Sequence, residues 1–249
     1  MDLGLKDRVY IVTGATRGLG NATARELAAD GAKVIITGRD AKSVEEAAAE
    51  LGPDAVGVAA DNADPSAAQR LVDQLDELGE HLDAPVIKGE TSNAQREKLD
   101  DQWQTAFETV FLGAVRLART AAAALGEGGV IGFVLSGSVH EPIAGLTISN
   151  GLRPGLAGFA KSLSDELGPR GIRVVGVLPA RIDTDRVREL DALSGDADAA
   201  RTANEARIPL RRYGTPEEFG KTAAFLLSPA ASYLTGIMVP VDGGARHGF

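Results

Sequence analysis

Hydrophobic and polar positions along this chain form two alternating patterns. Short apolar runs rich in β-branched residues are separated by longer amphipathic stretches. Most of the apolar runs are nearly continuous, which is typical of parallel strands that are covered on both faces. We therefore expect strands at residues 8–13, 33–37, 55–60, 83–88, 130–135, 172–178 and 237–241.

The amphipathic stretches between these runs predict helices. Residues 215–218 (TPEE) place a capping threonine, a proline at the first helical position and two acids in the first turn. Repeated strand–helix units imply a single parallel, doubly wound α/β sheet with helices on both faces, because parallel strands need a crossover. The expected helices span residues 21–30, 43–51, 65–78, 99–125, 154–167 and 216–227.

Two segments interrupt this rhythm. Residues 181–212 are polar and mixed in charge, and they start where a strand ends. Ligands of open α/β sheets bind outside the carboxyl ends of the strands, so we expect a substrate lid here, with a solvated pair of surface helices as the alternative. Pro85 lies within an expected central strand, where its missing N–H breaks the ladder. Either that strand is shorter than 83–88 or it is locally irregular.

Composition limits the classes of function. The formal net charge is 26 − 35 = −9, and an acidic protein repels phosphate backbones, so we expect no nucleic-acid partner. The absence of cysteine excludes disulfides, thiolate catalysis and cysteine-bound metals and fits a reducing compartment. Neither a signal-peptide pattern nor an apolar run of about 20 residues occurs, which predicts a cytoplasmic protein with no membrane partner. The three histidines share no metal-ligand spacing, so no metal is expected.

A glycine-rich loop follows the first strand and leads into a helix. Its sequence is TGATRGLG at residues 13–20. Glycines let the backbone turn tightly and approach a pyrophosphate, and the helix N-terminus offers free N–H groups to the anion. A dinucleotide is the expected ligand, and its expected contacts in this loop are Gly14, Thr16, Arg17, Gly18, Leu19 and Gly20.

The end of the second strand indicates which dinucleotide binds. Sites that prefer NAD place an acid there for the ribose 2′-hydroxyl, whereas an arginine accommodates a 2′-phosphate. Here Gly38 occupies the position of the acid and Arg39 follows. With Arg17 in the loop, Arg39 predicts NADP(H), because guanidinium forms paired bonds with phosphate. Asp40 is expected to cap the next helix.

The chain resembles the short-chain dehydrogenase/reductase family from residue 8 to residue 244. The loop has the family's TGxxxGxG form, residues 208–218 resemble its P–R–G–PEE run, and residues 241–244 resemble its VDGG ending. The resemblance implies a Rossmann fold over residues 1–249, a dinucleotide cofactor and a homotetramer or homodimer. It also implies further cofactor contacts at Asp61, Asn62, Pro179, Ile182 and Thr184.

The sequence differs from the family pattern at the positions of the family's catalytic residues. Residues 87–90 (IKGE) stand in place of its NNAG, and Val110 stands in place of a helical asparagine. Counting back without gaps from residues 166–174 puts Ser149 at the position of the catalytic tyrosine and Arg153 at that of the lysine. Ser136 matches the family's serine by its spacing of 13 residues to Ser149. Pro154 could disturb the helix beside Arg153.

Two classes of function follow. The first is an NADPH-dependent reductase of a ketone, enone or quinone-like small molecule, with Ser136, Ser149 and Arg153 as its catalytic residues. The second is an inactive NADP(H)-binding sensor or partner subunit. Serine can stabilise an oxyanion but is a poor acid, so the proton is expected from Ser149, His140, water or the substrate itself. We expect Lys88 to be a solvated loop residue.

Overall fold

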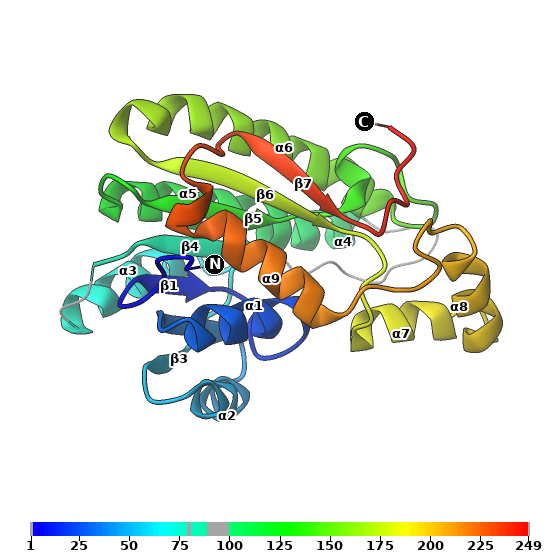
Figure 1. Cartoon of the computed structure of the whole chain (residues 1–249), viewed down its shortest axis with the longest axis horizontal. Helices are drawn as coiled ribbons and strands as arrows, with labels where there is room; N and C mark the ends of the chain where they lie inside the picture. The colour runs from blue at the N-terminus through cyan, green and yellow to red at the C-terminus, as the bar shows by residue number, and fades with distance from the viewer. Residues whose placement is uncertain (1, 79–80, 89–99, 249) are drawn as a thin grey trace.

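A single parallel sheet forms the centre of the molecule. The computed structural model describes residues 2–78, 81–88 and 100–248. Its seven strands follow the order β3-β2-β1-β4-β5-β6-β7, and every strand pair is parallel (Figure 1). This is the expected doubly wound architecture. The strands are β1 (Val9–Val12), β2 (Lys33–Gly38), β3 (Ala55–Ala59), β4 (Ala84–Lys88), β5 (Val130–Val134), β6 (Arg173–Pro179) and β7 (Ile237–Val241).

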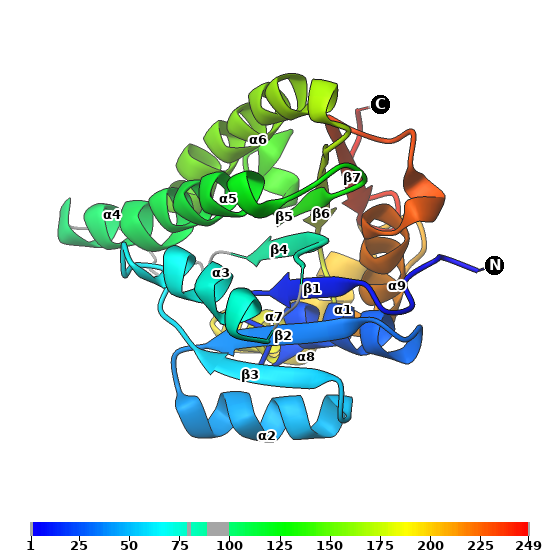
Figure 2. The ribbon, with the colours of Figure 1, turned by 90° about the vertical axis from the view of Figure 1, so that its left-hand side faces the viewer.

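Helices cover both faces of the sheet. Figure 2 shows the sheet from the side, with a layer of helices on each face. One buried apolar cluster joins the sheet to α3, α5 and α6, and the other joins it to α1, α2 and α9. No helix within the described parts of the chain is long and apolar enough to cross a membrane. The α-helices that cover the sheet are α1 (Gly18–Ala29), α2 (Ala41–Leu51), α3 (Ala67–Leu78), α5 (Gly113–Ala124), α6 (Thr147–Leu167) and α9 (Pro216–Leu227).

The order in which successive strands join the sheet reverses between β1 and β4, although all strands run parallel. β1 pairs with β2 on one side and with β4 on the other. A crevice forms outside the carboxyl ends of the strands at such a switch point. The loops after β1, β2 and β5 therefore meet at one end of the sheet, together with the carboxyl end of β4, and there the candidate site lies.

The start of α6 corrects the sequence prediction. We expected a helix from residue 154, but α6 begins at Thr147 and runs through Pro154. Ile148 and Leu152 pack into the core, and this burial outweighs the low helix propensity of the segment. Because the helix continues through Pro154, Arg153 lies on its buried side.

The expected long helix at residues 99–125 is divided by a π-helical turn. Its parts are α4 (Asp100–Ala106), the turn η1 (Phe107–Leu112) and α5, and residue 99 lies outside the described residues. Val110, which stands where the family has an asparagine, is 1% exposed in this turn. At the position of the family's polar asparagine, this turn therefore places an apolar side chain in the core.

β4 is shorter than predicted by one residue and still contains Pro85. Pro85 pairs in register with Ile11 of β1. The missing N–H of Pro85 interrupts the strand pairing only locally, because the Thr13 backbone N–H donates to the Val86 carbonyl oxygen at 3.0 Å in the next rung. The loop that follows Lys88 lies outside the described residues.

The excursion at residues 181–212 contains two helices, α7 (Asp185–Ala192) and α8 (Ala197–Glu205). Figure 1 shows them together beyond the N-terminal end of α9, on one side of the sheet. A buried carboxylate ties them to the rest of the fold. Asp191 accepts hydrogen bonds from Arg181 at 3.0 Å, Asn204 at 3.2 Å and Tyr213 at 2.9 Å.

Candidate active site

A cavity of about 680 Å³ opens at the carboxyl end of the sheet, a size typical of small-molecule sites. The glycine loop, the end of β5, the start of α6 and the face of α7 line it. Nine of the expected cofactor contacts belong to its lining: Gly14, Thr16, Arg17, Gly18, Leu19, Arg39, Pro179, Ile182 and Thr184.

The glycine loop has the shape that a pyrophosphate needs. Gly18 has φ of +61°, which disfavours other residues, and α1 starts there. A Cβ on Gly20 would lie 2.6 Å from the Gly14 carbonyl oxygen, so only glycine lets α1 approach the loop this closely. Gly20 therefore shapes the loop from behind the cavity lining. No described side chain caps α1, and its first N–H groups face the space where a phosphate would bind.

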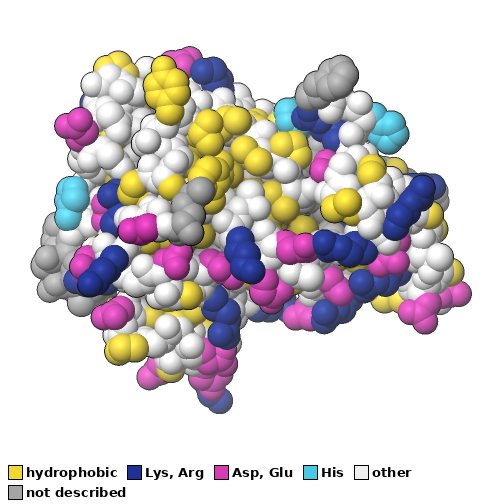
Figure 3. Space-filling view, in the orientation of Figure 1, with side chains coloured by type: hydrophobic (Ala, Val, Ile, Leu, Met, Phe, Trp, Pro, Cys, Tyr) yellow, Lys and Arg dark blue, Asp and Glu magenta, His cyan; other side chains and the backbone are white. Residues whose placement is uncertain are grey.

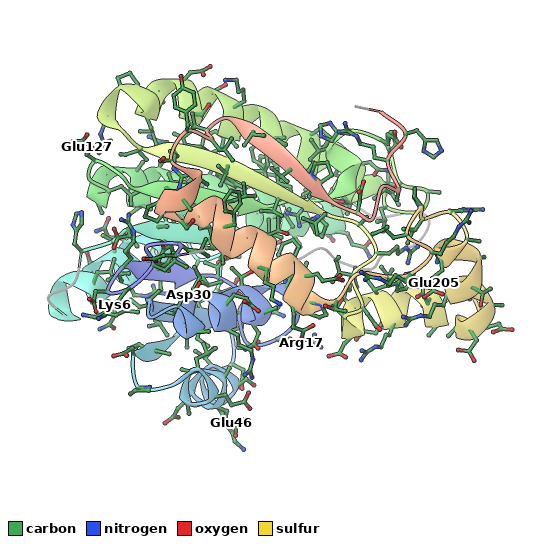
Figure 4. The ribbon with its side chains drawn as sticks, in the orientation of Figure 1. Lys6, Arg17, Asp30, Glu46, Glu127 and Glu205 are labelled. Carbon is green, nitrogen blue, oxygen red and sulfur yellow. The ribbon has the colours of Figure 1, made fainter. Side chains whose placement is uncertain are left out.

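Two arginines lie at the nucleotide end of the cavity. Arg39 and Arg17 both line it, and Arg17 is 74% exposed with its guanidinium 4.0 Å from Asp185. Figure 4 shows Arg17 on the loop before α1, on the side that faces α7. Asp40 caps α2 by accepting from the Ser43 N–H at 2.8 Å, as predicted.

Ser136 lies two residues after the end of β5 and lines the cavity. Its Oγ also accepts from the Ser138 N–H at 3.2 Å, where it caps the short 3-10 turn Gly137–Val139. The hydroxyl anchors a backbone turn and still faces the space beside the expected nicotinamide.

Ser149 lies inside α6 rather than at its cap. It lines the cavity, and its Oγ lies 3.0 Å from the Oγ of Ser138. Ser138 is 3% exposed and is not part of the cavity lining. The two cavity serines are thus joined through a buried third serine.

Arg153 lies one helical turn after Ser149 and lines the same cavity. It is 4% exposed, and its Nη1 donates to the Val134 carbonyl oxygen at 2.9 Å. Burial lowers the pKa of Arg153 to about 10. That value keeps the guanidinium charged near neutral pH, so it can hold an anion or a hydroxyl but does not release a proton there.

Three expected contributors lie elsewhere. Asp61 and Asn62 are not in the cavity lining, and Asn62 Nδ2 instead donates to the Lys88 carbonyl oxygen at 3.2 Å. His140 is exposed and also lies outside the lining. The adenine contacts at Asp61 and Asn62 remain a prediction.

Lys88 is the residue that sequence reasoning placed wrongly. It is the last residue of β4 and is half-buried in the cavity wall, not a solvated loop residue. The available signal was its position at the carboxyl end of a central strand. Its Cδ lies 3.8 Å from the point that a Cβ on Gly14 would occupy, so its stem extends beside the glycine loop.

Sequence reasoning also missed the buried cluster around Asp191. Tyr213 donates to this carboxylate, and the Arg201 guanidinium lies 4.6 Å from the Tyr213 ring centroid. Arg181 and Leu190, which flank this cluster, line the cavity. In the described part of the chain, no group of three or more histidine or acidic side chains could hold a metal ion.

Comparisons with known proteins agree with this geometry. The family model described as enoyl-(acyl carrier protein) reductase matches residues 14–246. The 3-oxoacyl-(acyl-carrier-protein) reductase of Pseudomonas aeruginosa is 35% identical, covering 97% of this chain and 98% of that protein. A short-chain reductase of Streptomyces niveus is 33% identical, covering 96% of this chain and 94% of the other.

Solved structures extend the similarity to the whole fold. L-sorbose reductase of Gluconobacter frateurii, solved with NADPH and L-sorbose, superposes with a TM-score of 0.94 at 29% identity and covers 100% of both chains. A short-chain dehydrogenase/reductase of Brucella melitensis gives a TM-score of 0.92 at 28% identity, again over 100% of both chains.

Proposed function

The chain belongs to the short-chain dehydrogenase/reductase family, and from this premise we propose that it is an NADPH-dependent reductase of a ketone, enone or quinone-like small molecule. One observation carries the proposal. The glycine loop and Arg39 line the same cavity as Ser136, Ser149 and Arg153. A nucleotide held by the first group would thus reach the second.

The cofactor is proposed from the charges at one end of the cavity. Arg17 and Arg39 would grip the 2′-phosphate, while the uncapped start of α1 would receive the pyrophosphate. Relatives support this choice, since the sorbose reductase structure contains NADPH. When bound, NADPH supplies the hydride of the reaction.

The polar residues at the other end orient the carbonyl. Ser136 would donate a hydrogen bond to the oxygen on which negative charge develops, and Ser149, which is joined to Ser136 through Ser138, would be a second donor. Arg153 is held by Val134 and stays charged, so it would stabilise the same negative charge. These groups favour the transition state through position and charge.

The excursion at residues 181–212 would act as the substrate lid. Val187, Leu190 and Leu193 of this segment line the cavity beside the expected nicotinamide. Apolar walls with a few polar groups suit a small organic carbonyl compound. A cytoplasmic location fits the absence of cysteine and a substrate of this kind.

The test is binding and turnover with the purified protein. Calorimetry with NADPH and NADH, followed by NADPH oxidation with ethyl acetoacetate and 9,10-phenanthrenequinone as probes, should give tight NADPH binding and turnover of at least one probe. Tight NADPH binding with no turnover over a broad carbonyl panel would instead favour the nucleotide-binding sensor or partner subunit.

A further inference from the structure

We propose that the ammonium group of Lys88 donates the proton that completes carbonyl reduction, in place of the family's tyrosine. This inference rests on the reductase function proposed above. It assigns a catalytic residue to a strand, β4, that contributes no residue of the tyrosine–lysine pair in the family pattern.

The backbone of Lys88 is fixed at the edge of the cofactor loop. Its N–H donates to the Thr13 hydroxyl oxygen at 2.9 Å, and its carbonyl oxygen accepts from Asn62 at 3.2 Å. Its stem lies beside Gly14. Strand pairing and side-chain contacts thus direct this lysine into the cavity from between β1 and β5.

The register of the sheet brings Lys88 to the catalytic serines. Lys88 pairs with Val134 of β5, and Ser136 follows Val134 by two residues. The Val134 carbonyl oxygen also accepts the hydrogen bond from Arg153. Lys88, Ser136 and Arg153 therefore converge on one short section of the cavity wall.

The composition of the cavity singles out Lys88 as an acid. Among its described lining residues there is no tyrosine and no histidine. Its serines are weak acids and its arginines keep their protons near neutral pH. The other charged groups that share the cavity are Arg17, Arg39, Arg153, Arg181, Arg186, Asp185 and Glu189. Both carboxylates come from α7, on the lid side.

The chain's three tyrosines are placed elsewhere. Tyr10 belongs to strand β1 and is fully buried, and burial raises its pKa to about 12. Tyr213 is 3% exposed and donates to Asp191. Tyr233 is fully exposed and is not part of the cavity lining. None of them can take over the role of the family's tyrosine.

The step balances without any further reactant. The hydride would come from bound NADPH, whose nicotinamide C–H bond would break and which would be oxidised to NADP⁺. The carbonyl carbon takes this hydride, and the π electrons of the C=O bond move to its oxygen. That oxygen forms a bond to one proton of the Lys88 ammonium, while the N–H electron pair returns to nitrogen. Water reprotonates the neutral amine before the next turnover. Ser136 and Arg153 stabilise the oxygen until the proton arrives.

Two substitutions separate proton donation from charge. Lys88→Met keeps the stem and removes the ammonium, whereas Lys88→Arg keeps a positive charge that does not leave near neutral pH. Lys161→Met is the matched control, because Lys161 is exposed on α6 and pairs with Asp165. For each protein we would measure NADPH affinity by calorimetry and the pH profile of kcat with ethyl acetoacetate.

The proposal predicts that kcat falls about a hundred- to ten-thousandfold in both Lys88 variants, while NADPH affinity changes by less than about threefold. Both variants should lose the part of the alkaline decline of kcat that deprotonation of the Lys88 ammonium causes and keep the part that Arg153, with its pKa of about 10, causes. Recovery of kcat in Lys88→Arg would reveal a purely electrostatic role, and loss of NADPH affinity in Lys88→Met would reveal a cofactor contact. Either result, or unchanged kcat, would overturn the proposal. An inactive wild type that binds NADPH would instead refute the reductase function itself.

Discussion

The hydroxyl oxygens of Ser138 and Ser149 lie 3.0 Å apart beneath the cavity. Ser138 also donates its backbone N–H to the Ser136 hydroxyl oxygen at 3.2 Å. The three serines form one chain, in which only Ser136 and Ser149 reach the cavity lining. The outer two can therefore contact a substrate, and Ser138 holds them in place.

The hydrogen-bonded row of three serines predicts that the loss of kcat depends on which serine is removed. Ser136→Ala should lower kcat by about ten- to a thousandfold, the range for losing one oxyanion donor. NADPH affinity should barely change, because the glycine loop and Arg39 lie at the other end of the cavity. Steady-state kinetics and calorimetry on the same preparations measure both quantities. Full activity in Ser136→Ala, with loss in Ser138→Ala or Ser149→Ala, would show that Ser136 is not the important donor.

Cofactor preference depends on Arg39. Arg39→Asp should reverse the preference from NADPH to NADH, because a carboxylate repels the 2′-phosphate and accepts from a 2′-hydroxyl. Arg119→Asp makes the same charge change at an exposed position of α5 and should leave the cofactor preference unchanged. Calorimetry with both nucleotides decides. Equal affinity for the two nucleotides in the wild type would refute the NADP(H) assignment.

The buried cluster predicts a difference between two tyrosines. Tyr213→Phe removes one donor from Asp191, which is 5% exposed, and should lower the free energy of unfolding by about 1–3 kcal/mol. Tyr233→Phe is the control, because Tyr233 is fully exposed and should change stability by less than about 0.5 kcal/mol. Urea denaturation measures both values. Equal stability of the two variants would contradict a stabilising role for the cluster.

Acid should weaken the start of α9 through Glu218. Hydrogen bonds from Arg212 and from the Thr215 backbone lower the pKa of Glu218 to about 2 from its ordinary value of 4.5. Because the folded-state pKa is depressed, this stabilisation is present above pH 4.5 and is lost as the pH falls toward about 2. Glu218→Gln should therefore flatten the fall of the melting temperature in this window, whereas Glu217→Gln should follow the wild type. A parallel fall in all three proteins would argue against the Glu218 contribution.

We also predict a homodimer or homotetramer that uses the helices at residues 99–125 and 154–167. Val110, Leu156 and Leu163 of these helices belong to the monomer core and are not available to an interface. Phe107 remains 37% exposed and stacks on Phe111. Figure 3 further shows apolar side chains gathered over the edge strand β7, a surface that self-association would bury. Light scattering should give a dimer or tetramer mass for the wild type and a smaller mass for Phe107→Glu. A monomer mass for the wild type would contradict this prediction.

The fold could be predicted from the sequence because parallel strands that are buried on both faces have nearly continuous apolar sequences. Each expected strand exists, with ends that differ by at most one residue. The start of α6 was missed because Pro154 resembles a first-turn proline and the preceding residues are poor helix formers. Burial of Ile148 and Leu152 decides the outcome, and burial depends on tertiary contacts.

The site was predictable only where a local pattern carries it. The glycine loop and Arg39 are local features, and they line the cavity as expected. Sequence analysis did not identify Lys88 and Asp191 as part of the site, because their contacts are with residues that are remote in the chain. Lys88 meets Val134 through strand pairing, and Asp191 meets Tyr213 through the folding of the lid segment.

The most direct test of the account is NADPH oxidation by the wild type and by Ser136→Ala, followed through the absorbance of the reduced nicotinamide, with the carbonyl panel as substrate. Product analysis should find one alcohol formed for each NADPH consumed. The account predicts turnover by the wild type and a loss of about ten- to a thousandfold in the variant, with unchanged NADPH affinity. A wild type that binds NADPH tightly but consumes none with any carbonyl compound would contradict it.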